Sequence, residues 1–324
     1  MIMRRVLPFF AVSALLITIG CGGGGNNVPG GASNVYVVQN GSTSSILEFP
    51  ASALSSATPS NTITIPMQTT FDAVAVDASG NLYVSASVVT APSTLYEVLV
   101  YAPGATGAAT PTRSITNFSN YVVSIAVDST GQLYALSGNT ISVFAANATG
   151  NATPVRRITG GATLLSSPYS LAVDSAQNIY VANTAAENIV VFSTSANGNV
   201  APSRTISGSN TQLYNTWGIA VDDAGDIFAT TQNTAASPAV STVLEFAPNA
   251  NGNALPTMTL TDFASDPIAG IQVDAAGNLY VLVIDNNLMT VDVFSAGASG
   301  GRAPEQNINS TAWTNSNYGQ IAIQ

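Results

Sequence analysis

The stretch "AVAVDASGNLYV" (residues 73–84) returns four more times along the chain, as "SIAVDSTGQLYA", "SLAVDSAQNIYV", "GIAVDDAGDIFA" and "GIQVDAAGNLYV". Each copy has an apolar run, an Asp, a short polar segment and a second apolar run that contains an aromatic residue. The Asp residues are 51, 46, 48 and 52 positions apart, which indicates a repeating unit of about fifty residues. They are Asp77, Asp128, Asp174, Asp222 and Asp274.

The Asp of each copy has a structural explanation. An Asp that follows an apolar strand accepts hydrogen bonds from the backbone N–H groups of the next turn, and the Gly three places later supplies a positive φ. One copy has Gln177 in place of this Gly, where we expect strain of about 1 kcal/mol. The same pattern could suggest calcium, but it offers fewer than the six to eight or so oxygen ligands that calcium needs. We therefore interpret the five Asp residues as structural turn residues, with Asp222, Asp223 and Asp226 as the best exception.

The rest of each unit predicts further strands. A second apolar stretch ends in an aromatic residue, and a loop with Pro then leads to a short alternating run. Alternation, β-branched residues and Gly, Asn or Asp turns favour strands, so each unit has four. Four strands per unit at this period predict an all-β fold, a β-propeller of antiparallel blades.

One unit carries a family resemblance. "SPYSLAVDSAQNIYVANTAAENIVVF" (167–192) resembles an NHL-type repeat, and the likeness covers most of residues 34–324. The resemblance implies a propeller domain over 34–324. It implies little about activity, because propellers of this kind host unrelated functions.

The two ends of the repeat region are both incomplete. "SNVYVVQN" (33–40) matches a second strand with no first strand ahead of it, and "YGQIAIQ" (318–324) matches a first strand with nothing after it. Together they make one blade, so we predict six blades and a ring closed by the C-terminal strand. Closure of this kind leaves no free sheet edge.

The N-terminus predicts export and anchoring. "MIMRR" is followed by an apolar run that is shorter than the roughly 20 residues a transmembrane helix needs. The run ends at Cys21, which is the single Cys of the chain. "LITIGC" resembles a bacterial lipoprotein signal, which implies a signal peptide over 1–20, a lipid on Cys21 and a periplasmic or cell-surface location. Residues 21–33 are then a Gly-rich tether. An ordinary cleaved signal peptide with an incidental Cys is the alternative.

Composition excludes several function classes. Charged residues are 7% of the chain, the net charge is −10, and there is no Lys and no His. An acidic chain without clustered basic residues does not favour nucleic acid. The surface must be mostly neutral and polar, which suits an extracytoplasmic domain that we expect to be monomeric.

Catalysis is not expected from the residues near the axis. Six-bladed propellers similar to this one include lactonases with an axial metal and lyases that use His or Zn. Without His, the chain lacks the usual general base and zinc ligand. One carboxylate among six equivalent positions does not make a metal site, so we predict neither enzyme nor cofactor. The positions, each just before an inner strand, are Asp72, Val123, Tyr169, Trp217, Ala269 and Gly319.

The same end of the propeller is rich in aromatic residues beside Asn, Ser and Thr, which suits a glycan or a peptide. We therefore predict a non-catalytic binding or scaffolding module of the cell envelope. Packing of these rings between blades is the alternative, as are a lactonase or lyase with degenerate ligands and a purely structural envelope protein. The outer-strand residues Arg113, Arg156 and Arg204 are expected to pair with nearby acids. The candidate ligand face comprises Asp72, Tyr121, Tyr169, Trp217, Trp313 and Tyr318.

Overall fold

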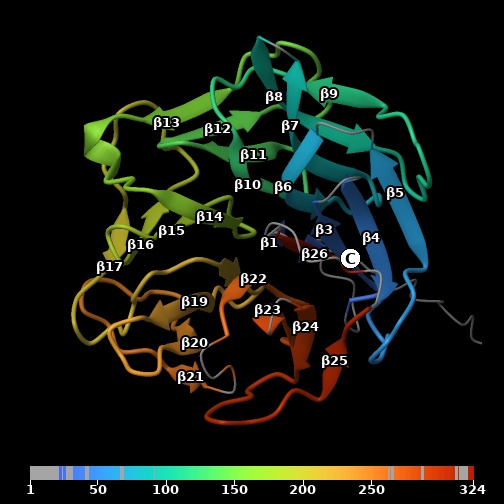
Figure 1. Cartoon of the computed structure of the whole chain (residues 1–324). Coiled ribbons are helices and arrows are strands. Elements are labelled where there is room, and N and C mark those ends of the chain that lie inside the picture. Colours follow the sequence, from blue (N-terminus) through green and yellow to red (C-terminus); the bar gives the residue numbers. More distant parts are fainter. Residues whose placement is uncertain are drawn as a thin grey trace, which may run out of the picture.

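The computed structural model describes residues 22–23, 25–26, 32–40, 44–65, 69–90, 92–261, 263, 266–285, 288–310, 313 and 320–324. Within them, six four-stranded antiparallel sheets form the blades of a propeller around a central axis (Figure 1). The fold predicted from the repeats is therefore confirmed.

The blades follow one another along the chain. Blade 1 contains β26 (Ile321–Ile323), β3 (Asn34–Gln39), β4 (Ser44–Pro50) and β5 (Asn61–Ile65). Blade 2 contains β6 (Thr69–Val76), β7 (Leu82–Thr90), β8 (Ser93–Tyr101) and β9 (Arg113–Ile115). Blade 3 contains β10 (Val122–Val127), β11 (Leu133–Ser137), β12 (Thr140–Phe144) and β13 (Arg156–Thr159). A 3₁₀ turn, η1 (Gly161–Thr163), leads to blade 4, with β14 (Pro168–Val173), β15 (Ile179–Asn183), β16 (Asn188–Phe192) and β17 (Arg204–Ile206). Blade 5 contains β18 (Ile219–Val221), β19 (Ile227–Asn233), β20 (Val240–Phe246) and β21 (Met258–Leu260). Blade 6 contains β22 (Ile268–Val273), β23 (Leu279–Asp285), β24 (Leu288–Phe294) and β25 (Gln306–Ile308).

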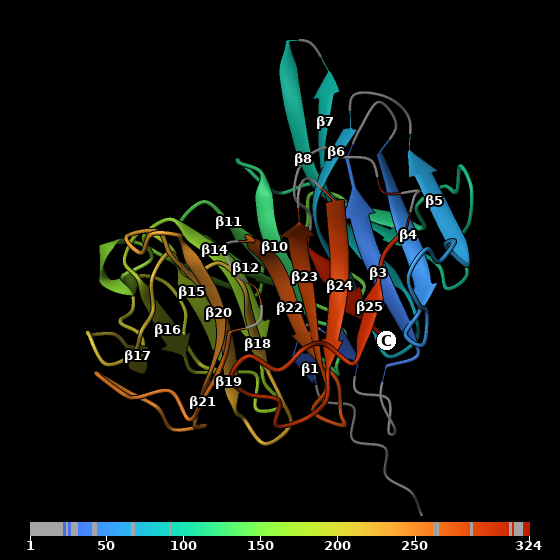
Figure 2. The ribbon, with the colours of Figure 1, turned by 60° about the horizontal axis from the view of Figure 1, so that its bottom comes forward.

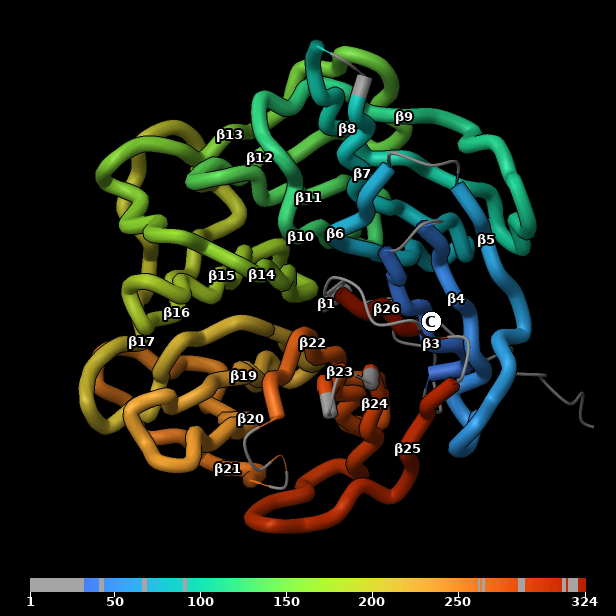
Figure 3. The backbone as a smooth tube through the Cα atoms, viewed as in Figure 1, coloured from blue at the N-terminus to red at the C-terminus, as the bar shows by residue number. Residues whose placement is uncertain are grey.

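The C-terminal strand closes the ring, as its sequence predicts. β26 pairs antiparallel with β3, so the red end of the chain lies against the blue one (Figure 3). The Gln324 amide N–H donates to the Asn34 carbonyl at 3.0 Å, and the Tyr36 hydroxyl donates to Gln324 Oε1 at 3.0 Å. Gln324 thus accepts the hydrogen bond from a tyrosine hydroxyl that an Asp accepts in other blades.

The turn between the first two strands of a blade also forms as expected. In blade 2, Asp77 Oδ1 accepts the amide N–H groups of Ser79 and Asn81, both at 2.9 Å. Gly80 has a φ of +82°. Gln177 takes the same left-handed conformation, with a φ of +63°, so the turn of blade 4 keeps its shape without Gly.

The outer-strand Arg residues bind differently from the prediction. Arg204 donates to the Pro248 carbonyl at 2.7 Å and the Ala250 carbonyl at 3.0 Å, both in the next blade, and to the Tyr180 hydroxyl at 3.3 Å. That hydroxyl donates to Asp174 Oδ2 at 3.0 Å, so the acid and the base meet through a phenol. Direct pairing with acids was therefore wrong. The same arrangement joins Arg113, Tyr83 and Asp77 in blade 2, and Arg156, Tyr134 and Asp128 in blade 3.

The core lies between the blades. In each of several gaps, a residue from the linker that enters a blade packs with the aromatic residue at the end of that blade's third strand. Phe118 meets Phe144 with ring centroids 5.5 Å apart, Phe263 meets Phe294 at 5.5 Å, and Leu165 and Phe192 share one cluster. These contacts repeat around the ring and join neighbouring blades.

The propeller has two distinct faces. Turns between first and second strands, and loops between third and fourth strands, lie on one side, which we call the turn face. Hairpins between second and third strands, and the linkers into each blade, lie on the other, which we call the loop face. The β7–β8 hairpin stands out from the loop face (Figure 2).

Four residues of the predicted tether form a short strand pair. β1 (Gly22–Gly23) and β2 (Gly25–Asn26) pair antiparallel. β1 contacts β10 and β14, and β2 contacts β6 and β26, which are inner strands. The pair therefore lies near the axis, where β1 is labelled in Figure 1. Residues 1–20 and Cys21 lie outside the described residues, and within those that are described no helix is long and apolar enough to cross a membrane.

Candidate functional site

In four blades the residue predicted to precede the inner strand lies inside that strand, at a β-bulge. The register between first and second strands shifts at Val123, Tyr169 and Ala269, and between Phe71 and Val74 in blade 2, where Asp72 lies. A bulge inserts a residue that is left out of the ladder and re-aims its side chain. The repeat thus places one side chain per blade at the loop-face end of an inner strand. Gly319, the sixth position, lies outside the described residues.

Trp217 occupies this position in blade 5, two residues before β18 begins. Its amide N–H donates to the Thr230 carbonyl at 3.0 Å, and the Gly218 amide N–H donates to Thr230 Oγ1 at 2.7 Å. A Cβ at Gly218 would lie 3.0 Å from Thr230 Oγ1 and 3.1 Å from Ile271 Cγ2. Because Gly218 has no side chain, the backbone at Trp217 and Gly218 can approach Thr230 of β19 closely, and the two hydrogen bonds fix the Trp217 backbone.

Two of the predicted ligand-face rings are in contact. Tyr169 and Trp217, from neighbouring blades 4 and 5, meet edge to face with centroids 4.9 Å apart and an interplanar angle of 80°. Both side chains are half-buried, so each still presents part of its ring to solvent. An edge-to-face pair is a favoured aromatic geometry and holds the Trp217 ring in place.

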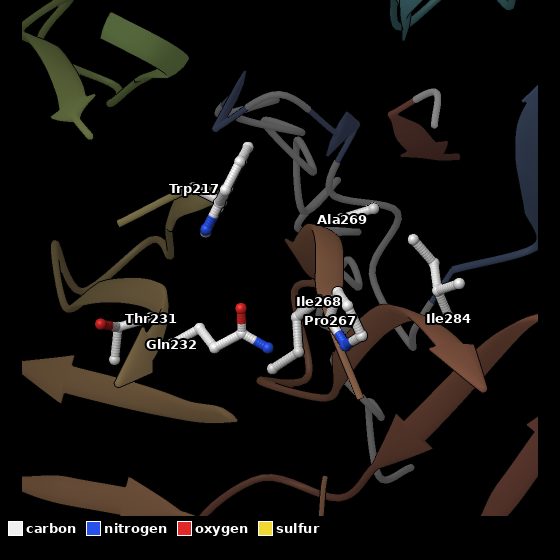
Figure 4. A pocket seen from close by; sticks show the side chains of 7 residues that line it. All are labelled: Trp217, Thr231, Gln232, Pro267, Ile268, Ala269 and Ile284. Carbon is white, nitrogen blue, oxygen red and sulfur yellow. The ribbon is translucent and has the colours of Figure 1, made fainter. Parts of the chain in front are cut away.

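A cavity of about 220 Å³ lies beside Trp217, between blades 5 and 6 (Figure 4). Its lining is mostly apolar and carries no charged side chain. The Gln232 side chain extends between Trp217 and Ile268 in Figure 4, and its Nε2 donates to Ser241 Oγ at 3.2 Å. The cavity is lined by Trp217, Thr231, Gln232, Pro267, Ile268, Ala269 and Ile284.

A second cavity of about 220 Å³ lies on the same face and includes Tyr214, Gln212 and Glu187. It is joined to the first through hydrogen bonds, because the Tyr214 amide N–H donates to Thr231 Oγ1 at 2.7 Å and the Gln232 amide N–H donates to the Tyr214 carbonyl at 3.3 Å. Thr231 and Gln232 line the first cavity. The segment from Tyr214 to Trp217 therefore contributes one lining residue to each cavity.

Acidic residues lie on both faces, and the Asp residues of the turns, such as Asp77, Asp128 and Asp174, lie on the turn face. Asp72, Glu97 and Glu187 belong to bulges or hairpins of the loop face, and burial raises the pKa of the Asp72 and Glu97 carboxyls above their usual values. The described Arg residues lie on fourth strands or in the loops before them. The Arg113, Arg156 and Arg204 guanidinium groups donate to carbonyl groups of turn-face loops, as Arg204 does to Pro248. Among the described residues, no group of three or more Cys, Asp or Glu could hold a metal ion.

Other candidate residues are separated from this site. Tyr121 is exposed, at 48% of its surface, on the linker into blade 3. Trp313 is a core residue that is 5% exposed and meets Phe49 with centroids 5.4 Å apart, so it takes the linker role that Phe118 has in blade 3. The prediction of a ligand platform at Trp313 is therefore wrong. Tyr318 lies outside the described residues.

Sequence reasoning missed the cavity residues from the hairpins. β19 and β23 have 7 residues, whereas β11 and β15 have 5, and the additional length supplies Gln232 and Ile284. The longer hairpin could have been found from the spacing between the aromatic residues of the second and third strands. This spacing is 12 residues from Tyr180 to Phe192 in blade 4, but 18 residues from Phe228 to Phe246 in blade 5. Insertions in repeats often mark the binding face.

Comparisons with solved structures place the fold among known propellers. The chain is similar to the periplasmic gluconolactonase of Pseudomonas aeruginosa, with a TM-score of 0.57 and 13% identity, over 85% of this chain and 82% of that one. It is also similar to a Bacteroides fragilis protein proposed to be a 6-phosphogluconolactonase, with a TM-score of 0.58 and 9% identity, over 90% of this chain and 98% of that one. A third similar structure is the WD40 propeller domain of Doa1, with a TM-score of 0.54 and 15% identity, over 87% of this chain and 80% of that one. No protein-family model and no curated protein sequence matches the chain. At these identities the likeness shows the propeller fold alone.

Proposed function

We propose that the chain is a non-catalytic recognition module of the bacterial cell envelope, which binds a glycan or a peptide on its loop face. The observation that carries the proposal is the Tyr169–Trp217 pair beside a cavity of about 220 Å³. A partly exposed ring next to a concave, mostly apolar site is the usual form of a binding pocket. The volume suits one side chain or one sugar ring rather than a large ligand.

The proposal includes a place and a class of repeat. The apolar run before Cys21 supports a lipid anchor and an extracytoplasmic location. The "SLAVDSAQNIYV" pattern supports an NHL-type repeat, because its Asp and aromatic positions have the same structural roles in successive blades.

Ligand arrays test this function directly. The full chain, purified in mild detergent, is applied to glycan and peptide arrays together with a Trp217→Ala variant. Tyr121→Ala is the matched control, because Tyr121 is also exposed on this face but lies outside both cavities. We expect binding that Trp217→Ala abolishes and Tyr121→Ala leaves intact. Binding to neither array, or equal binding by Trp217→Ala, would leave only a structural role.

Hydrolysis of a sugar lactone is a second candidate, favoured by one half-buried carboxylate at the axis end of blade 2. Burial raises the pKa of Asp72, as a general base for water attack on a carbonyl requires. Two of the similar structures bear lactonase names, the P. aeruginosa one without qualification. The described residues do not fit a metal centre, so such chemistry would depend on Asp72 itself. Glucono-lactone hydrolysis above the spontaneous rate, lost in Asp72→Asn, would favour the enzyme.

A further inference from the structure

We infer that the loop-face ligand is an extended peptide in which an apolar residue lies close to a basic residue. The apolar side chain enters the cavity at Trp217, and the basic side chain lies in the second cavity near Glu187. The inference rests on the proposed function, and chooses the ligand class within it from the chemistry of the two cavities.

The first cavity matches an apolar side chain better than a sugar. Its apolar wall is formed by Pro267, Ile268, Ala269 and Ile284. Three of its side chains carry polar atoms. Thr231 and Gln232 already have partners, because Thr231 Oγ1 accepts the Tyr214 amide N–H and Gln232 Nε2 donates to Ser241, and the third polar group is the indole N–H of Trp217. Hydroxyl groups surround a sugar ring, and burying them without partners costs about 1–3 kcal/mol each. A Leu or Phe side chain has no such cost.

The second cavity has the opposite chemistry. Ser207, Ser209 and Gln212 contribute polar side chains, and Glu187 contributes a carboxylate. These groups suit an amine or a guanidinium, which can donate to a carboxylate and to hydroxyl oxygens. Because the segment from Tyr214 to Trp217 contributes one lining residue to each cavity, an extended peptide can place two nearby side chains in them at once.

The charge of the face favours a cationic ligand. Asp72, Glu97 and Glu187 are acidic and belong to the loop face. Arg113, Arg156 and Arg204 donate instead to carbonyl groups of turn-face loops. The chain as a whole has a net charge of −10. Complementary charge accelerates association and fixes the register of a bound peptide. A basic peptide would therefore meet attraction on this face, and an acidic one repulsion.

The test uses labelled peptides of Gly and Ser that carry one Phe or Leu, with one Lys placed one, two or three positions away. A matched set has Glu in place of Lys, and chitotetraose provides a glycan probe. Binding to the full chain is measured by fluorescence polarisation. We expect the Lys peptides to bind at least about tenfold more tightly than the Glu peptides, and Trp217→Ala to weaken binding about thirtyfold or more, as for a buried aromatic anchor.

Glu187→Gln isolates the second cavity. It should weaken the Lys peptides about two- to fivefold, the range for an exposed ion pair, and should not weaken the Glu peptides. Glu97→Gln is the matched control, because Glu97 is a carboxylate of the same face that lines neither cavity. An equal effect of both substitutions, or equal binding of Lys and Glu peptides, overturns the inference.

The outcomes separate this inference from the proposed function. Chitotetraose binding that Trp217→Ala abolishes, without peptide binding, keeps the recognition module and overturns the peptide. Absence of binding by every probe counts against both. Peptide binding with the expected Lys preference, sensitive to Trp217→Ala and Glu187→Gln, supports both.

Discussion

At the scale of single residues, three blades share a linked Asp, Tyr and Arg. In blade 4 the Tyr180 hydroxyl donates to Asp174 and accepts from Arg204, whose guanidinium carbon lies 5.7 Å from the centre of the Tyr180 ring. One phenol thereby joins the turn of its own blade to an Arg that binds the next blade. Blade 5 has Phe228 and Met258 at the Tyr and Arg positions, so both partners are missing together.

Removing one phenol should destabilise the domain. Tyr180→Phe leaves Asp174 without this donor and Arg204 without this acceptor, while the ring that packs between the blades is kept. We expect the free energy of unfolding to fall by about 1–2 kcal/mol, the usual effect of lost hydrogen bonds to charged groups. Urea unfolding followed by circular dichroism measures the change. An unchanged midpoint would show that the phenol bonds contribute nothing net.

Blade 5 allows the reverse experiment. Burial raises the pKa of Asp222 above its usual value, and the nearby Asp226 charge adds to the shift. Phe228→Tyr combined with Met258→Arg should supply the missing donor and cation. We expect a favourable coupling of about 0.5–1.5 kcal/mol beyond the sum of the two single substitutions, measured by a double-mutant cycle. Strict additivity would mean that the phenol does not link the acid and the base.

The buried tyrosines also predict alkaline instability. Burial raises the pKa of Tyr36 and of Tyr180 to about 12, above the usual tyrosine value of 10.0. Between these values the unfolded chain loses the phenol protons and the folded chain keeps them. This stabilisation is therefore complete below about pH 10 and is lost as the pH rises towards 12. The urea midpoint should fall steeply over that interval, and less steeply in Tyr180→Phe. A flat profile would contradict the burial of these hydroxyls.

At the scale of the element, the short strand β26 holds the ring closed. Ile321 and Ile323 are 1% and 0% exposed, and the strand pairs with β3. Deleting residues 318–324 removes two buried Ile side chains, each worth about 1.5–3 kcal/mol, and opens a sheet edge. We expect cooperative loss of stability across the whole domain. A truncated chain that melts at the temperature of the full chain would contradict closure by this strand.

The elements of the repeat could be predicted because each unit obeys the same local rules. Asp77 and Gly80 specify a turn from sequence alone, and Ile321 and Ile323 have the alternation of an inner strand. Trp313 could not be placed, because its role depends on contact with Phe49, which is more than two hundred residues earlier in the chain. The cavity could not be predicted either, since its walls combine a linker, two hairpins and a bulge from two blades.

At the scale of the whole molecule, the chain enters the ring on the turn face. The Ala32 amide N–H donates to Asp274 Oδ2 at 3.3 Å, in a turn of that face, and β3 begins two residues later. Both cavities lie on the opposite face. If Cys21 carries a lipid, as proposed, and the lipid lies on the turn face, the recognition face is directed away from the membrane.

This orientation can be measured with two exposed leucines on opposite faces. Leu255 is 68% exposed in a loop of the turn face, and Leu164 is 51% exposed on a linker of the loop face. A single Cys is introduced at either position in the lipidated chain, where the lipid on Cys21 leaves no competing thiol, and is labelled with a dye. Bound to liposomes with an acceptor on the headgroups, the dye at residue 255 should be quenched more than the dye at residue 164. Equal or reversed quenching would contradict the orientation, and a Cys21→Ala chain that binds the liposomes equally well would contradict the anchor itself.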